Sequence, residues 1–325
     1  MKAAMKRREF LAGSGRLAAG LAAVALVRGA GAEEKKPPGL CLACRDGHLK
    51  ATGKNDTWAA LESIGAEGVE ASIGEDLALA GLFHPDRKYS AAAPAGIEAV
   101  LADMKAAGKR ISALCMANRF DERPEAEIEW CTKAARAAQA LGAKAIRIDV
   151  VARKRPVAEF LDLVAKTLKT LIEATESTGV AFAIENHGGT TNNPDFLTPL
   201  FERVGSPRLG LTLDTGNFYW FGHPLSKVYE LYEKFAPRVR HTHCKSIRYP
   251  EAEREKQRPM GWEYGKYNCP IYEGDIDFRR VIKILRAAAG YAGDLCVEDE
   301  SLGKFPAEER GGILAKEIRH LKECM

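Results

Sequence analysis

Four apolar segments of this chain end in, or contain, a side chain that can bind a metal ion. Glu185 ends the run Ala-Ile-Glu, Asp214 ends Leu-Thr-Leu-Asp, His243 lies in His-Thr-His-Cys-Lys, and Glu298 ends Leu-Cys-Val-Glu. Carboxylates together with one imidazole form a hard, oxygen-rich set, which suits Mg²⁺, Mn²⁺ or Co²⁺ and also accepts Zn²⁺. A lone buried carboxylate more often pairs with a cation or caps a helix, whereas four such segment ends together indicate a metal site.

The elements that must position these side chains form a repeating pattern. From residue 40 onward, short β-rich runs alternate with longer segments of helical periodicity, which is typical of βα units and a parallel sheet. The predicted strands are residues 40–44, 68–72, 110–116, 143–150, 180–185, 209–214, 239–245 and 294–298. The clearest helical segments are residues 56–64, 94–107, 125–141, 157–177 and 278–289.

Eight repeats without a Gly-x-Gly-x-x-Gly turn favour a closed barrel over an open dinucleotide-binding sheet. The predicted fold class is α/β, a single-domain (β/α)₈ TIM barrel. In such a barrel the carboxyl ends of the strands meet on one face, so the four side chains should converge from strands five to eight. The long connection at residues 246–276, rich in charge and aromatics, should overhang this face as a lid or a subunit contact.

The N-terminus has the pattern of an export signal. Arg7 and Arg8 precede a weakly apolar stretch, and Ala30-Gly31-Ala32 fits a small-residue cleavage site. We expect residues 1–32 to be a cleaved twin-arginine signal, residues 33–325 to be the barrel, and the mature protein to be periplasmic or otherwise exported. A retained anchor or an unstructured tail is the alternative.

Charge and cysteine content narrow the function classes. Without residues 1–32 the chain has 42 basic and 43 acidic side chains, which offers no general basic field for nucleic acid. Neither a nucleic-acid partner nor stable membrane insertion of the mature chain is expected. The eight cysteines lie mostly in apolar runs, and Cys41 and Cys44 occupy a predicted strand, so buried thiols are favoured over redox chemistry.

The sequence resembles the xylose isomerase-like TIM barrel superfamily, and within it the sugar phosphate isomerase/epimerase group, over essentially all of residues 33–325. The matching segments are 184–187 (IENH), 213–217 (LDTGN), 242–245 (THCK), 273–278 (EGDIDF) and 290–293 (GYAG) leading to Glu298. The resemblance implies that Glu185, Asp214, His243 and Glu298 bind one divalent ion. The His-x-Lys pattern favours His243 over His241, which should lie one layer lower.

The resemblance also implies a reaction. An ion that chelates a sugar carbonyl and the neighbouring hydroxyl would stabilise an enediolate when the α-carbon proton leaves, with Glu185 and Glu298 as acid and base. This chemistry is that of a sugar isomerase or epimerase. Candidate substrate-binding residues are His187, Asn217, Lys245, Arg248, Glu70 and His241. For His187, capping a turn is an equal alternative, and Arg147 with Asp149 is predicted to be a structural ion pair.

Other functions compete with this one. Proton abstraction at the same site could expel a β-substituent, giving a metal-dependent lyase or hydratase on 3-keto-glycosides or related keto-sugars. An abasic-site endonuclease shares the barrel, but the metal cluster of that family needs more histidines than the seven in this chain. Asn217 also stands where that family has a metal-binding histidine. A non-catalytic carbohydrate-binding barrel is a third class. The expected partner is a small sugar or keto-sugar, with a homo-oligomer as an open alternative.

Overall fold

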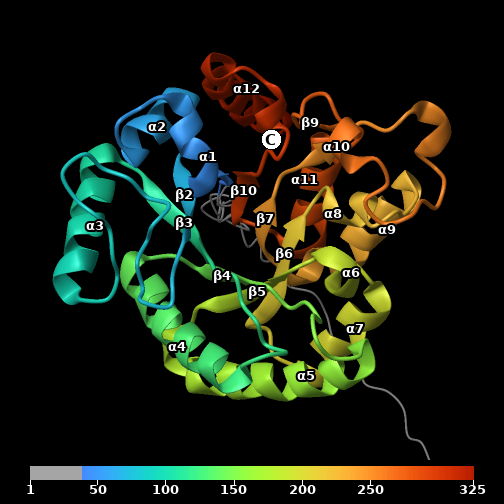
Figure 1. The fold of residues 1–325 in the computed structure, drawn as a ribbon, viewed down its shortest axis with the longest axis horizontal. Coiled ribbons are helices and arrows are strands. Elements are labelled where there is room, and N and C mark those ends of the chain that lie inside the picture. Colours follow the sequence, from blue (N-terminus) through green and yellow to red (C-terminus); the bar gives the residue numbers. More distant parts are fainter. Residues whose placement is uncertain (1–38) are drawn as a thin grey trace, which may run out of the picture. The chain divides into compact units, whose positions relative to one another are not determined.

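The computed structural model describes residues 39–325, in which eight parallel strands form a barrel in the order β10-β1-β2-β3-β4-β5-β6-β7 (Figure 1). The strands are β1 (Cys41–Arg45), β2 (Gly68–Ser72), β3 (Arg110–Cys115), β4 (Ala145–Ile148), β5 (Ala181–Glu185), β6 (Leu209–Asp214), β7 (Val239–His243) and β10 (Asp294–Val297). Cys244 N donates to Cys296 O at 2.7 Å, and Glu298 N donates to Cys244 O at 3.1 Å. These bonds join β7 to β10 and close the barrel, as predicted.

Helices surround the strands (Figure 1). They are α1 (Asp46–Leu49), α2 (Thr57–Ile64), α3 (Pro94–Ala107), α4 (Pro124–Leu141), α5 (Val157–Ala174), α6 (Gly188–Thr191), α7 (Pro194–Val204), α8 (Asn217–Trp220), α9 (Leu225–Phe235), α10 (Tyr264–Tyr267), α11 (Phe278–Ala289) and α12 (Ala307–Cys324). Asp277 accepts from the backbone N–H groups of Arg279 and Arg280, which fixes the start of α11. Gly290 ends this helix in the left-handed region at φ 60°, so the chain can turn into β10.

The predicted strands are all present, but some are shorter than the apolar runs suggested. Residues 143–150 were predicted to be extended, whereas β4 covers only Ala145–Ile148. The helical run at residues 157–177 divides into α5 and a 3-10 turn, Glu176–Thr178. Every residue of β5 and β6 is buried, because helices cover their outer side and neighbouring side chains fill the interior.

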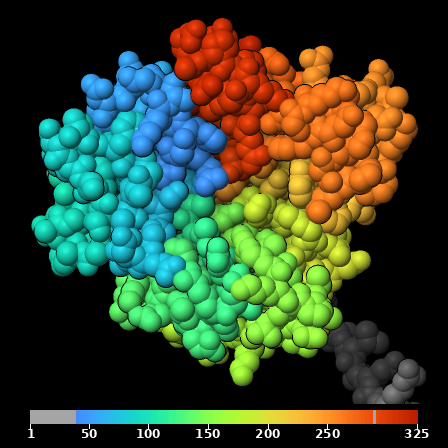
Figure 2. Space-filling view, viewed as in Figure 1, coloured from blue at the N-terminus to red at the C-terminus, as the bar shows by residue number. Residues whose placement is uncertain are grey.

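The first and last strands of the barrel are neighbours. β1 pairs in parallel with β10, with Ala43 opposite Cys296. The space-filling view accordingly shows the blue segments near the start of the described chain beside the red segments at its end (Figure 2). Arg45 at the end of β1 is thereby brought close to Glu298.

The cysteines of the described residues are all free thiols. Burial raises the pKa of the Cys41 thiol to about 12, and burial also raises the pKa of Cys44 well above its usual range. Neither thiol is activated as a thiolate in this environment. Among residues 39–325 no helix is both long enough and apolar enough to span a bilayer. The predicted signal at residues 1–32 lies outside the described residues.

Candidate metal and active site

The carboxyl ends of β5, β6 and β7, and the residue that follows β10, bring four side chains together. Glu185, Asp214, His243 and Glu298 are buried, and each offers one ligand atom, all within 4.8 Å of one another. The register explains this convergence, since Asp214 pairs with His243 and β7 adjoins β10. The geometry is the one expected from the ends of neighbouring barrel strands.

The donor atoms of this cluster fit a divalent cation. His243 Nδ1 lies 3.2 Å from Glu298 Oε2 and 3.5 Å from Glu185 Oε1, and all three side chains are buried. Within the described part of the chain, His243 Nδ1 and Asp214 Oδ2 make no hydrogen bond of acceptable geometry. Buried polar atoms without a hydrogen bond are costly unless another group binds them, and Asp214 Oδ2 is compensated in part by the ammonium of Lys245 at 2.9 Å. Three carboxylates and one imidazole nitrogen suit Mg²⁺, Mn²⁺, Co²⁺ or Zn²⁺.

Three basic side chains balance the charge of the cluster. Arg147 Nε donates to Glu185 Oε2 at 2.5 Å, Arg45 pairs with Glu298, and Lys245 Nζ lies 2.9 Å from Asp214 Oδ2. Burial by itself would raise the pKa of Glu185, but Arg147 and His243 outweigh it and hold that pKa well below its usual range. For Asp214 burial dominates over the attraction of Lys245 and raises the pKa to about 7.

A second layer of polar groups lies beneath the cluster. His241 Nδ1 lies 2.8 Å from both oxygens of Asp294, and His241 Nε2 lies 3.0 Å from Glu70 Oε1. Burial would lower the pKa of His241, but Asp294 and Glu70 raise it to about 9. Glu70 also contacts His243 Nε2 at 3.0 Å. His241 therefore lies one layer below His243, as expected.

A cavity of about 380 Å³ opens onto the cluster. Its walls include His187, Asn217 and Lys245, three of the predicted substrate-binding residues. Asn217 Nδ2 donates to Glu185 Oε1 at 3.1 Å, and Lys245 Nζ donates to Glu300 Oε1 at 3.1 Å. These side chains can therefore meet a ligand that touches the carboxylates.

The other predicted substrate-binding residues lie elsewhere. Arg248 is exposed and does not line this cavity. Glu70 and His241 are fully buried beneath the cluster and expose no surface that a substrate could touch, so the structure does not support the prediction that they bind substrate. Position thus separates these three residues from the three in the cavity wall.

His187 and Arg147 show pairings that the sequence did not indicate. His187 makes no side-chain capping bond at α6; its Nδ1 lies 2.9 Å from Asp149 Oδ1, and the side chain is 47% exposed. Arg147 lies 3.8 Å from Asp149 but pairs more closely with Glu185. The expected Arg147–Asp149 pair is therefore the weaker of the contacts that Arg147 makes.

The connection after β7 is a folded segment that reaches over the cavity. Its two short strands, β8 (Ser246–Ile247) and β9 (Asn268–Cys269), pair antiparallel at its base. Arg258 stacks between Tyr219 and Tyr249, with its guanidinium carbon 4.6 and 4.3 Å from the two ring centroids. Tyr264 lines the cavity and donates to Glu300 at 2.5 Å. The predicted overhang is therefore present.

Sequence reasoning missed four other residues of this wall: Arg45, Trp220, Tyr264 and Glu300. Arg45 directly follows the predicted first strand, where a barrel places catalytic side chains, so its position could have identified it. Glu300 lies two residues after Glu298. Trp220 and Tyr264 reach the cavity through the tertiary packing of α8 and of the long loop, for which the sequence has no periodic signal.

Comparison with known proteins identifies the family. The sequence profile of the Xylose isomerase-like TIM barrel family matches residues 58–324, and the chain belongs to this family. An inosose dehydratase of Klebsiella pneumoniae subsp. pneumoniae is 28% identical over 141 residues, which cover 42% of this chain and 46% of that protein. The chain thus spans about half the length of the curated relatives it matches.

Solved structures share the fold at lower sequence identity. The IolI protein, in a structure with a bound zinc atom, has a TM-score of 0.64 at 17% identity, covering 88% of this chain and 99% of that one. A xylose isomerase domain protein from Planctomyces limnophilus has a TM-score of 0.62 at 18% identity, covering 88% and 98%. At these identities the similarity establishes the barrel architecture alone.

Proposed function

We propose that this chain is a divalent-metal-dependent enzyme. It removes a proton from the carbon next to the carbonyl of a sugar or a related cyclic keto-polyol, and a proton is then added back to give an isomer or epimer. The observation that carries the proposal is the convergence of Glu185 and Glu298 with Asp214 and His243 at a cavity floor. A divalent ion bound by these four side chains would polarise the carbonyl and stabilise the negative charge that develops on its oxygen.

The residues of the chain divide the remaining work. Glu185 ends β5 and Glu298 follows β10, so the two carboxylates reach the cavity from different strands, 3.5 and 3.2 Å from the same atom, His243 Nδ1. In the proposed reaction one of the two, as the carboxylate, accepts the proton as the C–H bond breaks, and the other, as the carboxylic acid, donates its proton to the enediolate. Asn217 orients Glu185 through its 3.1 Å hydrogen bond, while Arg147 keeps that carboxylate ionised.

A second candidate is dehydration or another β-elimination, and the match to inosose dehydratases favours it. After the same proton abstraction, the carbon–oxygen bond at the β position breaks, a carbon–carbon double bond forms, and the leaving oxygen takes up a proton. Lys245 and His187 line the cavity and carry N–H groups that could supply it. This alternative needs no change in the cluster.

Deuterium exchange tests the proposal. Metal-loaded protein is incubated in heavy water with keto-sugars, keto-glycosides and cyclic keto-polyols, and NMR follows solvent deuterium at the carbon beside the carbonyl. Exchange with a new stereoisomer supports isomerisation, and exchange with loss of a substituent supports elimination. Glu185→Gln and Glu298→Gln should each lower exchange by about 10²–10⁴-fold at saturating metal, whereas exposed Glu125→Gln should not. Ligand binding without exchange contradicts the proposal and favours a carbohydrate-binding barrel.

We also propose that residues 1–32 direct export and that the barrel domain is residues 33–325. The paired arginines and the Ala-Gly-Ala sequence support this proposal. N-terminal sequencing of the mature protein tests it: a new terminus at Glu33 is expected, and an intact Met1 in an exported or a cytoplasmic fraction contradicts it.

A further inference from the structure

A second and larger cavity adjoins the one at the cluster. Its volume is about 790 Å³, twice the 380 Å³ of the smaller cavity, and Arg45, Arg147 and His187 line both. Sites for small molecules usually measure about 300–1,000 Å³. The smaller cavity is therefore sized for one reacting ring, and the larger one leaves room for a second group attached to it.

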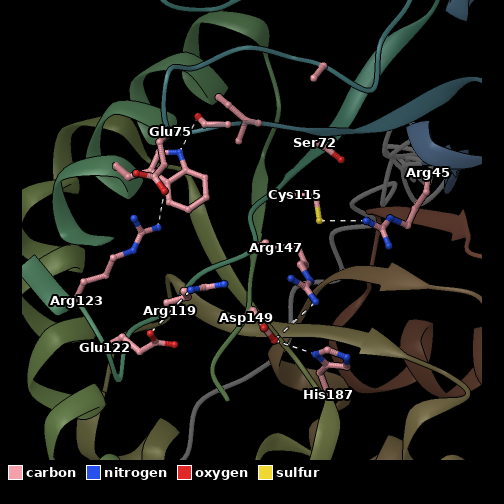
Figure 3. A pocket seen from close by; sticks show the side chains of 15 residues that line it. Arg45, Ser72, Glu75, Cys115, Arg119, Glu122, Arg123, Arg147, Asp149 and His187 are labelled. Carbon is pink, nitrogen blue, oxygen red and sulfur yellow. Dashed lines mark hydrogen bonds and ion pairs between the residues drawn. The ribbon is translucent and has the colours of Figure 1, made fainter. Parts of the chain in front are cut away.

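Most of the wall of the larger cavity comes from the first half of the chain. Ile73 and Gly74 follow β2, Ala117 and Arg119 follow β3, and Trp130 belongs to α4. Figure 3 shows Arg45, Arg147 and His187 on one side of this space, and Arg119, Glu122 and Arg123 on the other. A ligand held at the cluster would thus pass the first group of side chains and reach the second.

Apart from Arg119, the charged side chains of this wall are already paired closely with one another or with neighbours. Arg123 lies 2.6 Å from Glu75 and 2.7 Å from the buried Glu127. Glu122 lies 2.8 Å from Lys154 Nζ, and Asp149 lies 2.5 Å from Arg153. Arg45 and Arg147 pair with Glu298 and Glu185.

These pairings favour a neutral ligand over an anion. A phosphate or carboxylate bound by Arg45, Arg123 or Arg147 would have to displace a carboxylate from that arginine, at a cost in paired charge, and Arg119 alone has no close carboxylate to displace. Hydroxyl groups need no such exchange, because an arginine has five N–H donors and a carboxylate about four acceptor sites, so paired groups keep free positions. The apolar surface of Ile73, Ala117 and Trp130 can pack against the C–H face of a ring.

We propose that the larger cavity binds the non-reacting part of the substrate, a neutral polyhydroxylated group such as a second sugar ring joined to the ring that reacts at the cluster. This inference rests on the proposed function and assigns its substrate class: a keto-disaccharide or keto-glycoside, neither a free monosaccharide nor a sugar phosphate. Arg119 is the candidate hydrogen-bond donor to this second ring, because its side chain is 60% exposed and its nearest carboxylate, of Glu122, lies 3.9 Å away.

Equilibrium binding separates the possibilities. Calorimetry on the metal-loaded protein compares one keto-hexose in three forms: free, as a disaccharide, and as a phosphate ester. We expect the disaccharide to bind at least about tenfold more tightly than the other two, because it fills both cavities. Ala117→Trp fills the larger cavity and Arg119→Gln removes a charged donor, and both should weaken the disaccharide more than the free sugar. Ala106→Trp, on the exposed side of α3, is the matched control.

Three outcomes of the calorimetry would overturn the inference. They are equal affinity for the free sugar and the disaccharide, tightest binding of the phosphate ester, and an equal loss of affinity for the free sugar and the disaccharide in Ala117→Trp. Deuterium exchange on the same ligands shows whether the proposed function fails as well. Exchange that is as fast on the free sugar as on the disaccharide contradicts the assigned substrate class alone, whereas tight disaccharide binding without exchange contradicts the proposed function alone.

Discussion

Glu70 holds His243 in one orientation, because both oxygens of its carboxylate lie close to Nε2 of that ring, at 3.0 and 3.1 Å. The opposite nitrogen, Nδ1, faces Glu185 and Glu298. A histidine that donates one N–H to a carboxylate presents its other nitrogen to a metal with a fixed tautomer.

Replacing that carboxylate should weaken metal binding without removing a proposed ligand. Glu70→Gln should raise the dissociation constant for Co²⁺ or Zn²⁺ by about 10–100-fold, as is typical when such a partner is lost. Competition with a chromophoric chelator measures this change. Glu67→Gln, at an exposed position just before β2, is the control and should bind as the wild type does. Unchanged affinity in Glu70→Gln contradicts the positioning role.

Metal should stabilise the folded protein through Asp214. A ligand at 100 times its dissociation constant adds about 2.7 kcal/mol to the free energy of unfolding. In Asp214→Asn the remaining oxygen can still accept from Gly216 N and Asn217 N, bonds of 2.7 and 2.9 Å in the wild type, so the turn should survive. Thermal unfolding with and without Mn²⁺ should show a metal-dependent rise in Tm for the wild type and for Asp86→Asn, and none for Asp214→Asn. A full rise in Asp214→Asn excludes this residue as a ligand.

Lys245 should matter more to the metal-free protein than to the loaded one. Its ammonium lies 2.9 Å from Asp214 Oδ2, and both side chains are buried. Lys245→Met leaves a buried carboxyl without its cation. At a pH above the Asp214 pKa of about 7 this change costs up to about 3–5 kcal/mol, and at lower pH the carboxyl takes up a proton and the cost falls. Urea unfolding in EDTA should show that loss, and saturating Mn²⁺ should restore a large part of it. Lys283→Met, on the exposed face of α11, should change stability by less than about 0.5 kcal/mol in either condition. A loss of equal size with and without Mn²⁺ contradicts this account.

Glu317 should make stability fall as pH rises. Burial, followed by the nearby Asp299, raises the pKa of this α12 carboxyl well above its usual range, and only Oε1 accepts a hydrogen bond, from Ile271 N at 3.0 Å. The folded state thus keeps a proton that the unfolded chain releases above a pH of about 4. Stability contributed by this proton is full below that pH and is lost as pH rises toward the folded pKa.

Glu317→Gln cannot ionise and should remove this dependence. The free energy of unfolding of the variant, relative to the wild type, should increase between pH 5 and 8 by up to about 1.4 kcal/mol per pH unit. Urea denaturation across that range measures it, with exposed Glu323→Gln on the same helix as the control. Parallel pH profiles for wild type and Glu317→Gln show that the carboxyl is ionised in the folded state.

The barrel and the four-residue cluster follow from local sequence pattern. Each of Glu185 and Asp214 ends a run whose length and composition mark a buried strand, and parallel strands in a barrel end on one face. The strand ends are predicted less accurately, since the apolar run at residues 143–150 extends two residues beyond β4 at each end. Apolar composition continues past the last ladder hydrogen bond there, so composition cannot mark the end.

The partners of the cluster could not be predicted in the same way. The contact of His187 with Asp149 joins residues 38 positions apart, and that of Arg45 with Glu298 joins residues 253 apart. Tyr264 contacts Glu300 from the same long loop in which Arg258 stacks between two tyrosine rings. Such contacts depend on the closed barrel and on irregular loop conformation, and neither has a sequence period.

The four cluster residues all come from the second half of the barrel, at positions 185–298, whereas the wall unique to the larger cavity comes from residues between Ser72 and Asp149, most of them from the loops after β2 and β3. Loops after β2 and β3 can therefore change length and composition without moving a carboxylate of the cluster. Exchanging those two loops between members of the family, in evolution or in the laboratory, can thus change the substrate specificity while the cluster that carries out the reaction stays the same.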